Sequence, residues 1–388
     1  MRNFTFKGLF LTAVFILLGC LSIQAADDDL ITKQITIKLD EAGTLPDKIG
    51  SSRWYDITNL KIIGEINGTD LRMIRNMAGA EGSGNLSVLD LSEAKIVGGG
   101  DDYYNHYYTS NDEIGSYAFI GCSGLTSLNL PASITSIGDY AFYGCRGLTS
   151  LNLPAGITRI GECAFYGCSG LTNLTLPASL TKIGESAFEG CSGLTSLTLP
   201  ASITSIGESA FRYCSGLTSL NLPASILGID KYTFYGCSGL TTLTLPADID
   251  WIGDYAFYGC SGLTSINLPA SILSINESAF SYCSGLTSIY VYAEKVPRIS
   301  RYSFEGCASR KCTLYVPKGT YDNYRLSVFG YFENIVEFDA TGIDKTTTST
   351  DVEEVSRYSV NGQRLVGPTK GLNIVKYSDG SVKKVAVE

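Results

Sequence analysis

Cysteine is the residue whose spacing could first suggest chemistry in this chain, which has 12 cysteines among 388 residues. Eight of them recur every 23 residues from Cys122 to Cys283, and Cys307 follows after 24. Metal sites use close pairs such as C-x-x-C, and the sequence has none. The spacing therefore indicates a column of small, buried, apolar thiols. Cys307 and Cys312 fall outside this pattern, and a disulfide between them is the alternative that stays open.

Few other residues have types and spacings suited to catalysis. The one histidine, His106, lies in a tyrosine-rich segment, whereas nucleophilic triads and histidine metal sites need an imidazole held by a scaffold. The motifs G-x-x-x-x-G-K-[ST], H-E-x-x-H and G-x-S-x-G are absent. Two carboxylates suited to glycoside hydrolysis could meet in space, but a column of equivalent carboxylates gives no unique pair. We expect no enzymatic activity, no cofactor and no metal site.

The element that positions the cysteines is a 23-residue repeat. Leu125 to Leu130 alternates apolar and polar residues as a short strand does, and Pro131 ends it. Ala141-Phe142 is expected on a short helical turn that Gly144 closes. A fixed period with an L-x-x-L-x-L core is typical of leucine-rich repeats. The predicted fold class is a repeat solenoid of the leucine-rich repeat type, a right-handed β/α superhelix with a small all-β C-terminal module.

Tandem units of the form I-G-x-x-A-F-x-G-C-S-G-L-T-S-L-x-L-P resemble the BspA-like leucine-rich repeat surface proteins of bacteria, over roughly residues 30–340. The resemblance implies a secreted or surface-attached, non-enzymatic protein. It also implies adhesion and the binding of host or matrix proteins. The family defines no binding residues that a motif could transfer to this chain.

The start of the chain resembles an export signal. Residues 1–25 combine a basic start with an apolar run from Gly8 to Leu18 that is too short to span a membrane. Ordinary cleavage would follow Ala25, whereas Leu17 to Cys20 resembles a lipoprotein box that would leave Cys20 lipidated. Both alternatives predict a protein that is secreted or held at the bacterial cell surface or outer membrane, without membrane insertion after cleavage.

The rest of the chain divides by the regularity of its repeats. A helix capped at Thr69-Asp70 is expected near the start, and the last residues predict hairpin strands at 355–360, 373–377 and 382–387 with turns at Asn361-Gly362 and Asp379-Gly380. This last module resembles the C-terminal sorting tails of surface-exported bacterial proteins. The predicted segments are an N-terminal cap with irregular repeats (27–110), regular repeats (111–310), a C-terminal cap (311–340), a linker (341–351) and a sorting-type β tail (352–388).

A tyrosine-rich segment interrupts the repeats at residues 98–109. It contains Tyr103, Tyr104, Tyr107 and Tyr108, which we expect in one exposed loop. Tyrosine provides large, fairly rigid contact area with a polar tip, a property suited to recognition. The alternative is that the loop folds its tyrosines back over the first repeat.

A second candidate surface surrounds Trp251. This residue takes the outward-facing place of Ser136 and Lys182 in other turns, and Tyr232, Tyr255 and Tyr258 lie nearby in sequence. Such a patch could hold a sugar ring or anchor a protein partner. The residue after each repeat phenylalanine adds an aromatic row. Its members are Tyr143, Tyr166, Tyr235 and Tyr258, with Tyr213 and Tyr282 in the neighbouring glycine place.

Two polar columns have structural explanations. A mostly acidic column follows the glycine of I-G-x-x-A-F and suits a cation, but the first turn of a short helix also favours a carboxylate through the helix dipole. Small hydroxyls and amides such as Ser127 and Asn129 cover the strand face, where they could bond one another between turns. The acidic column reads Asp139, Glu162, Glu185, Glu208, Lys231, Asp254, Glu277 and Arg301.

The net charge of the chain limits the classes of partner that it can bind. The net charge of −9 argues against nucleic acid and anionic membranes. The leading hypothesis is a monomeric, adhesin-like solenoid that binds a host glycoprotein or extracellular matrix protein. The alternatives are a carbohydrate-binding surface protein and a structural surface-layer component.

Overall fold

The computed structural model describes residues 30–50, 53–80, 82, 84–340, 354–359, 364–365, 370–377 and 382–387. The predicted signal peptide with Cys20, the predicted linker at 341–351 and the turns predicted at Asn361-Gly362 and Asp379-Gly380 lie outside these residues.

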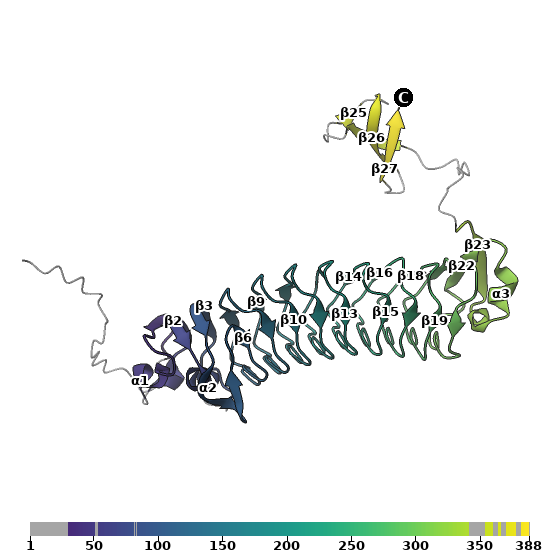
Figure 1. Cartoon of the computed structure of the whole chain (residues 1–388). Helices are drawn as coiled ribbons and strands as arrows, with labels where there is room; N and C mark the ends of the chain where they lie inside the picture. Colours follow the sequence, from purple (N-terminus) through teal and green to yellow (C-terminus); the bar gives the residue numbers. More distant parts are fainter. Residues whose placement is uncertain are drawn as a thin grey trace, which may run out of the picture.

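The repeats wind into a parallel β-solenoid of about 13 turns, which confirms the predicted repeat fold (Figure 1). On one side of the turns the L-x-x-L-x-L segments run as strands, except at Ser196, which forms only an isolated bridge, and together these segments form the long-strand wall. Their leucines point into the core, because alternate strand residues face opposite sides. The wall contains β1 (Ile35–Lys38), β2 (Asn59–Ile66), β3 (Val88–Ile96), β7 (Ser127–Asn129), β9 (Ser150–Asn152), β11 (Asn173–Thr175), β14 (Ser219–Asn221), β16 (Thr242–Thr244), β18 (Ser265–Leu268), β20 (Ser288–Val291), β22 (Thr313–Pro317) and β23 (Asn334–Phe338).

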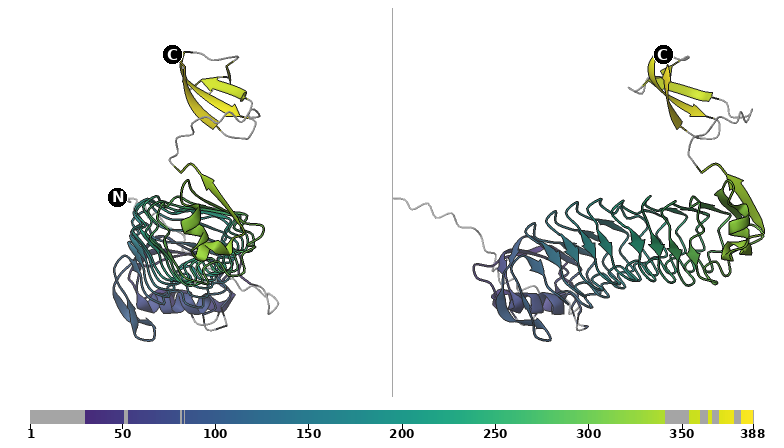
Figure 2. Two further views of the ribbon diagram at one scale, coloured as in Figure 1. Left: turned by 90° about the vertical axis from the view of Figure 1, so that its right-hand side faces the viewer. Right: turned by 45° about the vertical axis from the view of Figure 1, so that its right-hand side comes forward.

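A second wall, the short-strand wall, is built from the I-x-x-I segments. Its strands pair in parallel from turn to turn, as Arg159 does with Lys182. When the solenoid is viewed close to its axis, the successive turns superpose (Figure 2). The strands of this wall are β6 (Glu113–Ile114), β8 (Ser136–Ile137), β10 (Arg159–Ile160), β12 (Lys182–Ile183), β13 (Ser205–Ile206), β15 (Gly228–Ile229), β17 (Trp251–Ile252), β19 (Ser274–Ile275) and β21 (Arg298–Ile299).

The A-F-x-G-C segments form the third side, which we call the turn edge. The short helical turns predicted here are wrong, because every regular repeat has a tight turn in this place. The residue before Ala-Phe has a positive φ, for example 57° at Tyr140 and 49° at Ser186, which a helix does not allow. Backbone N–H groups of the turn edge instead donate to carbonyl groups of the next turn. For the phenylalanines from Phe119 to Phe280, the distance from the backbone nitrogen to that carbonyl oxygen is 2.7–2.9 Å.

Two side-chain columns fill the core behind this edge. Nine phenylalanines from Phe119 to Phe304 stack with ring centroids 5.1–5.6 Å apart. The cysteines from Cys145 to Cys307 each donate an Sγ–H to the phenylalanine carbonyl of the preceding turn, at 3.1–3.2 Å. The cysteine column is therefore a packed, hydrogen-bonded part of the core.

Cys307 and Cys312 are both free and buried, so the disulfide that the sequence left open is not formed. Cys307 does not fall outside the column either, since its thiol bonds the Phe280 carbonyl as the other cysteines do. The repeat that ends at Cys307 is one residue longer than the others, and the additional residue lies before β21, because Arg298 pairs with Ser274 at a spacing of 24 residues.

The N-terminal turns hold most of the helix of the solenoid. These helices are α1 (Leu45–Ile49), the 3₁₀ helix η1 (Trp54–Asp56) and α2 (Gly68–Met77). The N-cap of α2 is Asn67 rather than Thr69 or Asp70, and Asp70 closes the capping box from the third helical position. Buried Asp70 also accepts the backbone N–H groups of Gly43 and Leu45, which ties α1 to α2.

The far end of the phenylalanine column is covered by residues that follow β22. These form α3 (Tyr321–Arg325), the 3₁₀ helix η2 (Val328–Tyr331) and β23. Phe329 and Phe332 pack on Phe304, with centroids 5.6 and 5.2 Å apart, and the buried Tyr324 hydroxyl donates to the Ala293 carbonyl at 2.6 Å. Apolar surface of the last turn is thereby kept from water.

The C-terminal residues form an antiparallel sheet of their own. Its strands are β24 (Glu354–Ser359), β25 (Arg364–Leu365), β26 (Gly371–Tyr377) and β27 (Val382–Val387), in the order β25-β24-β26-β27. The sequence predicted three of these strands and missed β25, which is only two residues long. None of the helices among the described residues is long and apolar enough to cross a membrane.

Candidate binding surfaces

The turn edge presents tyrosines at three places in the repeat, and we call this surface the tyrosine edge. One place precedes Ala-Phe, one directly follows the phenylalanine, and the third is the glycine place after that, which Tyr213 and Tyr282 occupy. Stacked turns are in register, so tyrosines in equivalent places lie above one another. The tyrosines of the edge are Tyr117, Tyr140, Tyr143, Tyr166, Tyr213, Tyr232, Tyr235, Tyr255, Tyr258 and Tyr282.

The first cluster on this edge joins the tyrosine-rich segment to the first regular repeats. The rings of Tyr117 and Tyr140 are stacked at 5.0 Å, and those of Tyr143 and Tyr166 at 4.7 Å. The ring of Tyr107 packs against that of Tyr117 at a tilt, with the ring centroids 4.8 Å apart. Tyr140 donates its hydroxyl to Glu162 at 2.8 Å, and this bond is the main cause that raises the pKa of Tyr140.

The second cluster surrounds Arg212. Tyr232 stacks on Tyr255 at 5.2 Å and Tyr235 stacks on Tyr258 at 4.8 Å, while Tyr213 meets Tyr235 edge-on at 5.4 Å. The Arg212 guanidinium lies 4.9–5.7 Å from the ring centroids of Tyr213, Tyr232 and Tyr235, within cation–π range. Tyr213 is 46% exposed, so part of the cluster faces solvent.

Glu189 occupies the turn between the two clusters, and its ion-pair partner Arg212 lies in the following turn, within the second cluster. They form an ion pair of 3.3 Å in which Glu189 is buried, and the nearby Glu189 carboxylate is the main cause that raises the pKa of Tyr166. The same places hold tyrosine on either side, so the edge runs from Tyr117 to Tyr282 with one charged link in its middle.

The tyrosine-rich segment is a β-hairpin rather than an exposed loop. Its strands are β4 (Gly99–Tyr104) and β5 (Tyr107–Thr109), joined at Asn105-His106, where both residues have positive φ as a two-residue hairpin requires. Tyr103 is only 3% exposed and donates its hydroxyl to the Ser116 carbonyl at 2.7 Å.

The four tyrosines of the hairpin therefore differ in what they can contact. Tyr104 lies under the Arg75 guanidinium and stacks on Tyr117 at 5.5 Å. Tyr107 and Tyr108 remain exposed. The expectation of four exposed tyrosines is wrong for Tyr103, because the hairpin packs against the first repeats.

Trp251 lines a separate groove on the short-strand wall, which we call the Trp251 groove. Its volume is about 610 Å³, and it is bounded by β17, β19 and the segment before β21. The indole ring lies over Gly228 of the preceding turn, where a Cβ would overlap the ring. The groove is lined by Asp250, Trp251, Ala270, Ile272, Leu273, Ser274, Ala293, Lys295, Val296, Pro297 and Arg298.

The structure does not bring the predicted Trp251 patch together. Among the described residues no tyrosine lines the Trp251 groove; instead, Tyr232 stacks on Tyr255 along the tyrosine edge, and Tyr258 meets Tyr255 at a tilt. Sequence reasoning missed the groove residues Leu273, Lys295 and Arg298. A signal was present, because Leu227 and Leu273 replace the threonines of the column Thr135, Thr158, Thr181 and Thr204.

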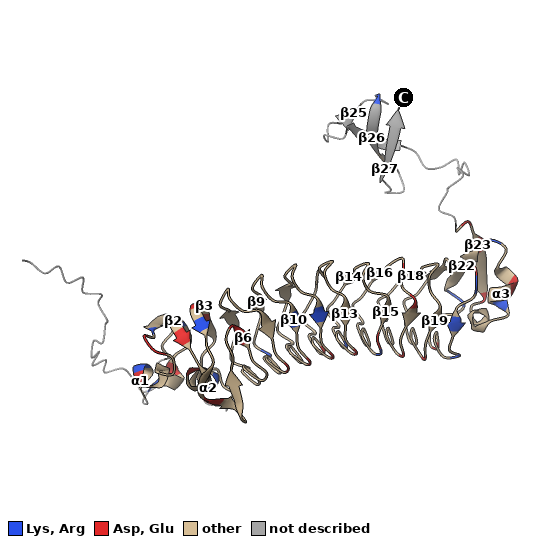
Figure 3. Ribbon diagram, in the orientation of Figure 1, with Lys and Arg blue, Asp and Glu red and all other residues tan. Residues whose placement is uncertain are grey.

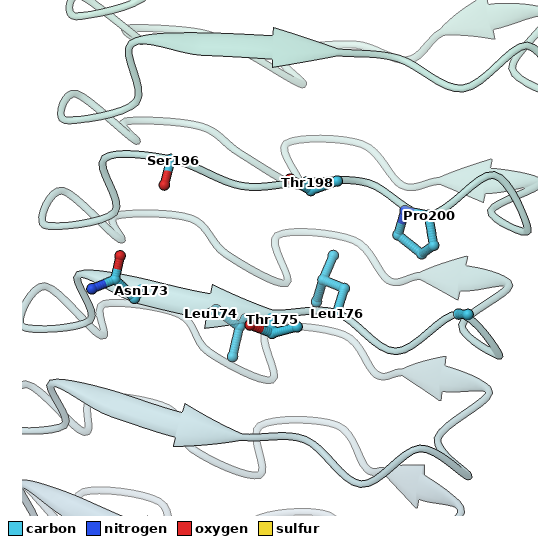
Figure 4. Close-up of a pocket in the computed structure, with 8 residues that line it drawn as sticks. Asn173, Leu174, Thr175, Leu176, Ser196, Thr198 and Pro200 are labelled. Atoms are coloured by element: carbon cyan, nitrogen blue, oxygen red, sulfur yellow. The ribbon is translucent and has the colours of Figure 1, made fainter. Parts of the chain in front are cut away.

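The long-strand wall has a shallower hollow of about 320 Å³ (Figure 4). It lies where β11 meets the next turn only through the isolated bridge between Asn173 and Ser196. Thr175, Thr198 and Pro200 line it, and none of its lining residues is charged. The hydrogen bonds between turns that were expected at places such as Ser127 and Asn129 are formed one residue earlier in the repeat. There the hydroxyls of threonines from Thr126 to Thr287 donate to the preceding turn at 2.9–3.3 Å.

The acidic column follows the turn edge, as the red segments in Figure 3 indicate. Since this segment is not helical, the helix-dipole explanation is wrong. Asp139 and Asp254 instead accept backbone N–H groups of the next turn, from Glu162 at 2.9 Å and Glu277 at 3.2 Å. Within the described residues, no group of three or more His, Cys, Asp or Glu side chains is arranged to hold a metal ion.

The parallel walls, the leucine core and the in-register turns define a leucine-rich repeat solenoid. The chain belongs to the BspA type leucine rich repeat family, whose six-copy model matches residues 112–239 and 204–335. No curated protein matches the sequence.

Several solved structures are similar to the chain. A leucine-rich repeat protein of Bacteroides ovatus is 26% identical, with 61% of this chain and 67% of that chain covered and a TM-score of 0.45. A Treponema pallidum leucine-rich repeat protein is 36% identical over 40% of this chain and 72% of that one, with a TM-score of 0.38. A leucine rich cell surface protein of Faecalibacterium prausnitzii is 19% identical over 66% and 88%, with a TM-score of 0.25.

Proposed function

We propose that this chain is an exported, non-enzymatic cell-surface protein that binds a host glycoprotein or extracellular matrix protein through its tyrosine edge. The observation that supports this most strongly is the edge itself, with two tyrosine clusters in equivalent places of a rigid solenoid. Tyrosine and arginine are enriched among the residues that dominate binding energy at protein interfaces.

The rigidity of the edge favours recognition by preformed contacts. Each turn of the edge is bonded to the next through backbone N–H groups at about 3 Å or less, as from Tyr232 to Asp254 and from Tyr255 to Glu277. The tyrosines therefore lose little freedom when a partner binds, which reduces the entropic cost of association. Tyr213 and Tyr282, at 46% and 49% exposed, supply the most accessible rings.

Export and surface attachment are part of the same proposal. The predicted signal peptide and membership of the BspA type family support them. We assign the sheet of β24 to β27 as a sorting module, on the resemblance of its hairpin sequence to the tails of surface-exported bacterial proteins.

The test uses the full chain and a double variant, Tyr232→Ser with Tyr255→Ser. Serine occupies this place in the turns of Ser186 and Ser209, so the fold should tolerate it. The matched control is Tyr290→Asn, which removes a half-buried tyrosine from the long-strand wall and inserts the residue found at Asn267.

Each protein is applied to arrays of extracellular host proteins, untreated and deglycosylated, with a glycan array in parallel. Saturable binding to protein spots that survives deglycosylation, and that weakens at least about tenfold in the double variant only, supports the proposal. Binding that follows the sugar favours the carbohydrate-binding alternative. Absence of binding on both arrays, together with self-association in light scattering, would favour the alternative of a structural surface-layer component.

A further inference from the structure

The Trp251 groove lies on a different side of the repeat from the tyrosine edge. Leu273 in its lining, and Leu227 two turns earlier and outside that lining, stand where other repeats have threonine. In the N-terminal repeats, threonine hydroxyls in this place donate to the preceding turn, at 3.0 Å from Thr181 and 3.3 Å from Thr204. Leucine cannot make that bond. Yet Leu227 is 56% exposed and Leu273 is 64% exposed, although exposure of a leucine side chain to water is unfavourable.

The groove also holds two basic side chains that form no ion pair with any described residue. They are Lys295 and Arg298, and both are exposed. Among the described lining residues Asp250 is the one carboxylate, so two cations stand against one carboxylate in the groove. This contrasts with the net charge of −9 of the whole chain. An anionic partner is therefore favoured at this groove and disfavoured over most of the surface.

Trp251 forms one border of the groove. Its ring lies over Gly228 of the preceding turn, and the residue lines the groove together with Leu273 of the following turn. Tryptophan is strongly enriched at the residues that dominate interface energies, and it contributes most where it meets an apolar group inside a pocket. The aliphatic lining from Ile272, Leu273, Val296 and Pro297 fits an aliphatic or aromatic side chain better than the hydroxylated face of a sugar.

We propose that the Trp251 groove docks an acidic peptide segment of a partner protein. A bulky apolar side chain of the segment packs against Trp251 and Leu273, and its flanking carboxylates pair with Lys295 and Arg298. The strands β15, β17, β19 and β21 are already paired with one another, so recognition takes place through side chains rather than by addition of a strand. This site does not depend on the tyrosine edge.

The repeat itself supplies variants that leave the fold intact. Trp251→Ser and Leu273→Thr insert the residues that other turns have in the same places, Ser136 and Thr135, and Arg298→Ser inserts the residue of Ser274. The control is Lys182→Ser, which removes an exposed cation from the same column on a distant turn. Circular dichroism checks that all four variants retain the fold.

The probe is a fluorescent peptide with four glutamates around a central Phe-Leu pair, titrated into the full chain and followed by anisotropy. Matched peptides replace the glutamates by lysine or the Phe-Leu pair by serine. We expect saturable binding of the first peptide only. Trp251→Ser should weaken it at least about 30-fold, and Arg298→Ser a few-fold with a smaller dependence on salt. Lys182→Ser should bind as the unaltered chain does.

Three results would overturn the proposal. They are equal binding of the lysine peptide, unchanged binding by Trp251→Ser, and binding only of carboxylated sugars in a parallel titration. If Lys182→Ser weakened binding of the peptide as much as Arg298→Ser did, the peptide would be held by general charge attraction rather than by the groove, which would also contradict the proposal. The variant of Tyr232 and Tyr255 should bind the peptide normally, so failure here and failure of the tyrosine edge can be told apart.

Discussion

At the scale of single residues, Asp70 is a buried carboxylate on which several backbone donors depend. It accepts backbone N–H groups from Gly43 at 2.6 Å, Leu45 at 2.9 Å and Asn67 at 2.9 Å. One carboxylate thus satisfies donors from two helices and the segment before them. Because a buried donor without an acceptor costs free energy, these bonds hold the N-terminal turns together.

We therefore expect Asp70→Ala to reduce the free energy of unfolding by about 3 kcal/mol or more, since three donors lose their acceptor. The control Asp47→Ala removes an exposed carboxylate of α1 and should stay within about 0.5 kcal/mol of the unaltered protein. Denaturant titrations of both variants check this, and equal stability of the two would show that Asp70 has no special role.

The buried thiols predict a reactivity pattern. Burial raises the pKa of Cys122 to about 12 and that of Cys214 well above its ordinary value of 9.0. The thiolate is the reactive form. A thiol reagent should therefore label the native protein slowly, and the half-buried Cys163 first among the described cysteines. Cys163→Ser should remove that first phase, while denaturant should make the remaining thiols react.

The same thiols predict the alkaline limit of stability. A thiol whose pKa is raised by folding keeps its proton, whereas in the unfolded chain it ionises above pH 9.0. Their contribution is thus complete below pH 9.0 and is lost as pH rises, at up to about 1.4 kcal/mol per thiol and pH unit. Unfolding titrations at rising pH should show this decline. A flat profile would contradict burial of the column.

At the scale of elements, the pairing of β15 with β17 decides where Trp251 lies. Gly228 stands opposite Trp251 in the parallel register, and the indole ring occupies the space that a side chain at 228 would need. Other turns have serine, lysine or arginine in this place. The conformation of the tryptophan therefore depends on a glycine one full repeat earlier.

Gly228→Ser should displace the indole ring into solvent and shift its fluorescence to longer wavelength, with little loss of secondary structure. A Trp54→Phe background isolates the signal, because the chain has two tryptophans. Gly156→Ser serves as the control, since a Cβ there approaches only the Ile134 carbonyl, at 3.3 Å. An unchanged emission spectrum would mean that the ring does not depend on Gly228.

At the scale of the whole molecule, stability comes from contacts between neighbouring turns. Every regular turn offers the next one the same phenylalanine, cysteine and leucine places, so the turns act as interchangeable units. The distance between the two tyrosine clusters is therefore set by the number of turns between them.

Deletion of residues 169–191 removes one period and should leave a folded solenoid with both clusters present and one turn closer, by roughly 4.8 Å. Deletion of 169–180 removes half a period and sets one wall against the other, so it should abolish cooperative folding. Circular dichroism and limited proteolysis distinguish the two. If the half-period deletion folded as well as the full one, the walls would not determine the register.

The sequence by itself determined the features that recur in every repeat. The 23-residue period defined the solenoid, the buried cysteine column and the aromatic row, because in-register turns give equivalent residues equivalent neighbours. It even contained a departure that helps to form the Trp251 groove, although Leu273 is a single substitution that gains meaning only beside Trp251 and Arg298.

Tertiary structure decided what the period does not specify. It placed Tyr103 in the core, Cys307 in the column and Trp251 apart from Tyr255. It also replaced the expected helical turns by tight turns with positive φ. These outcomes depend on how a hairpin packs, where an extra residue is taken up and which way a ring leans. Contacts between different turns set each of them, and a single repeat does not contain that information.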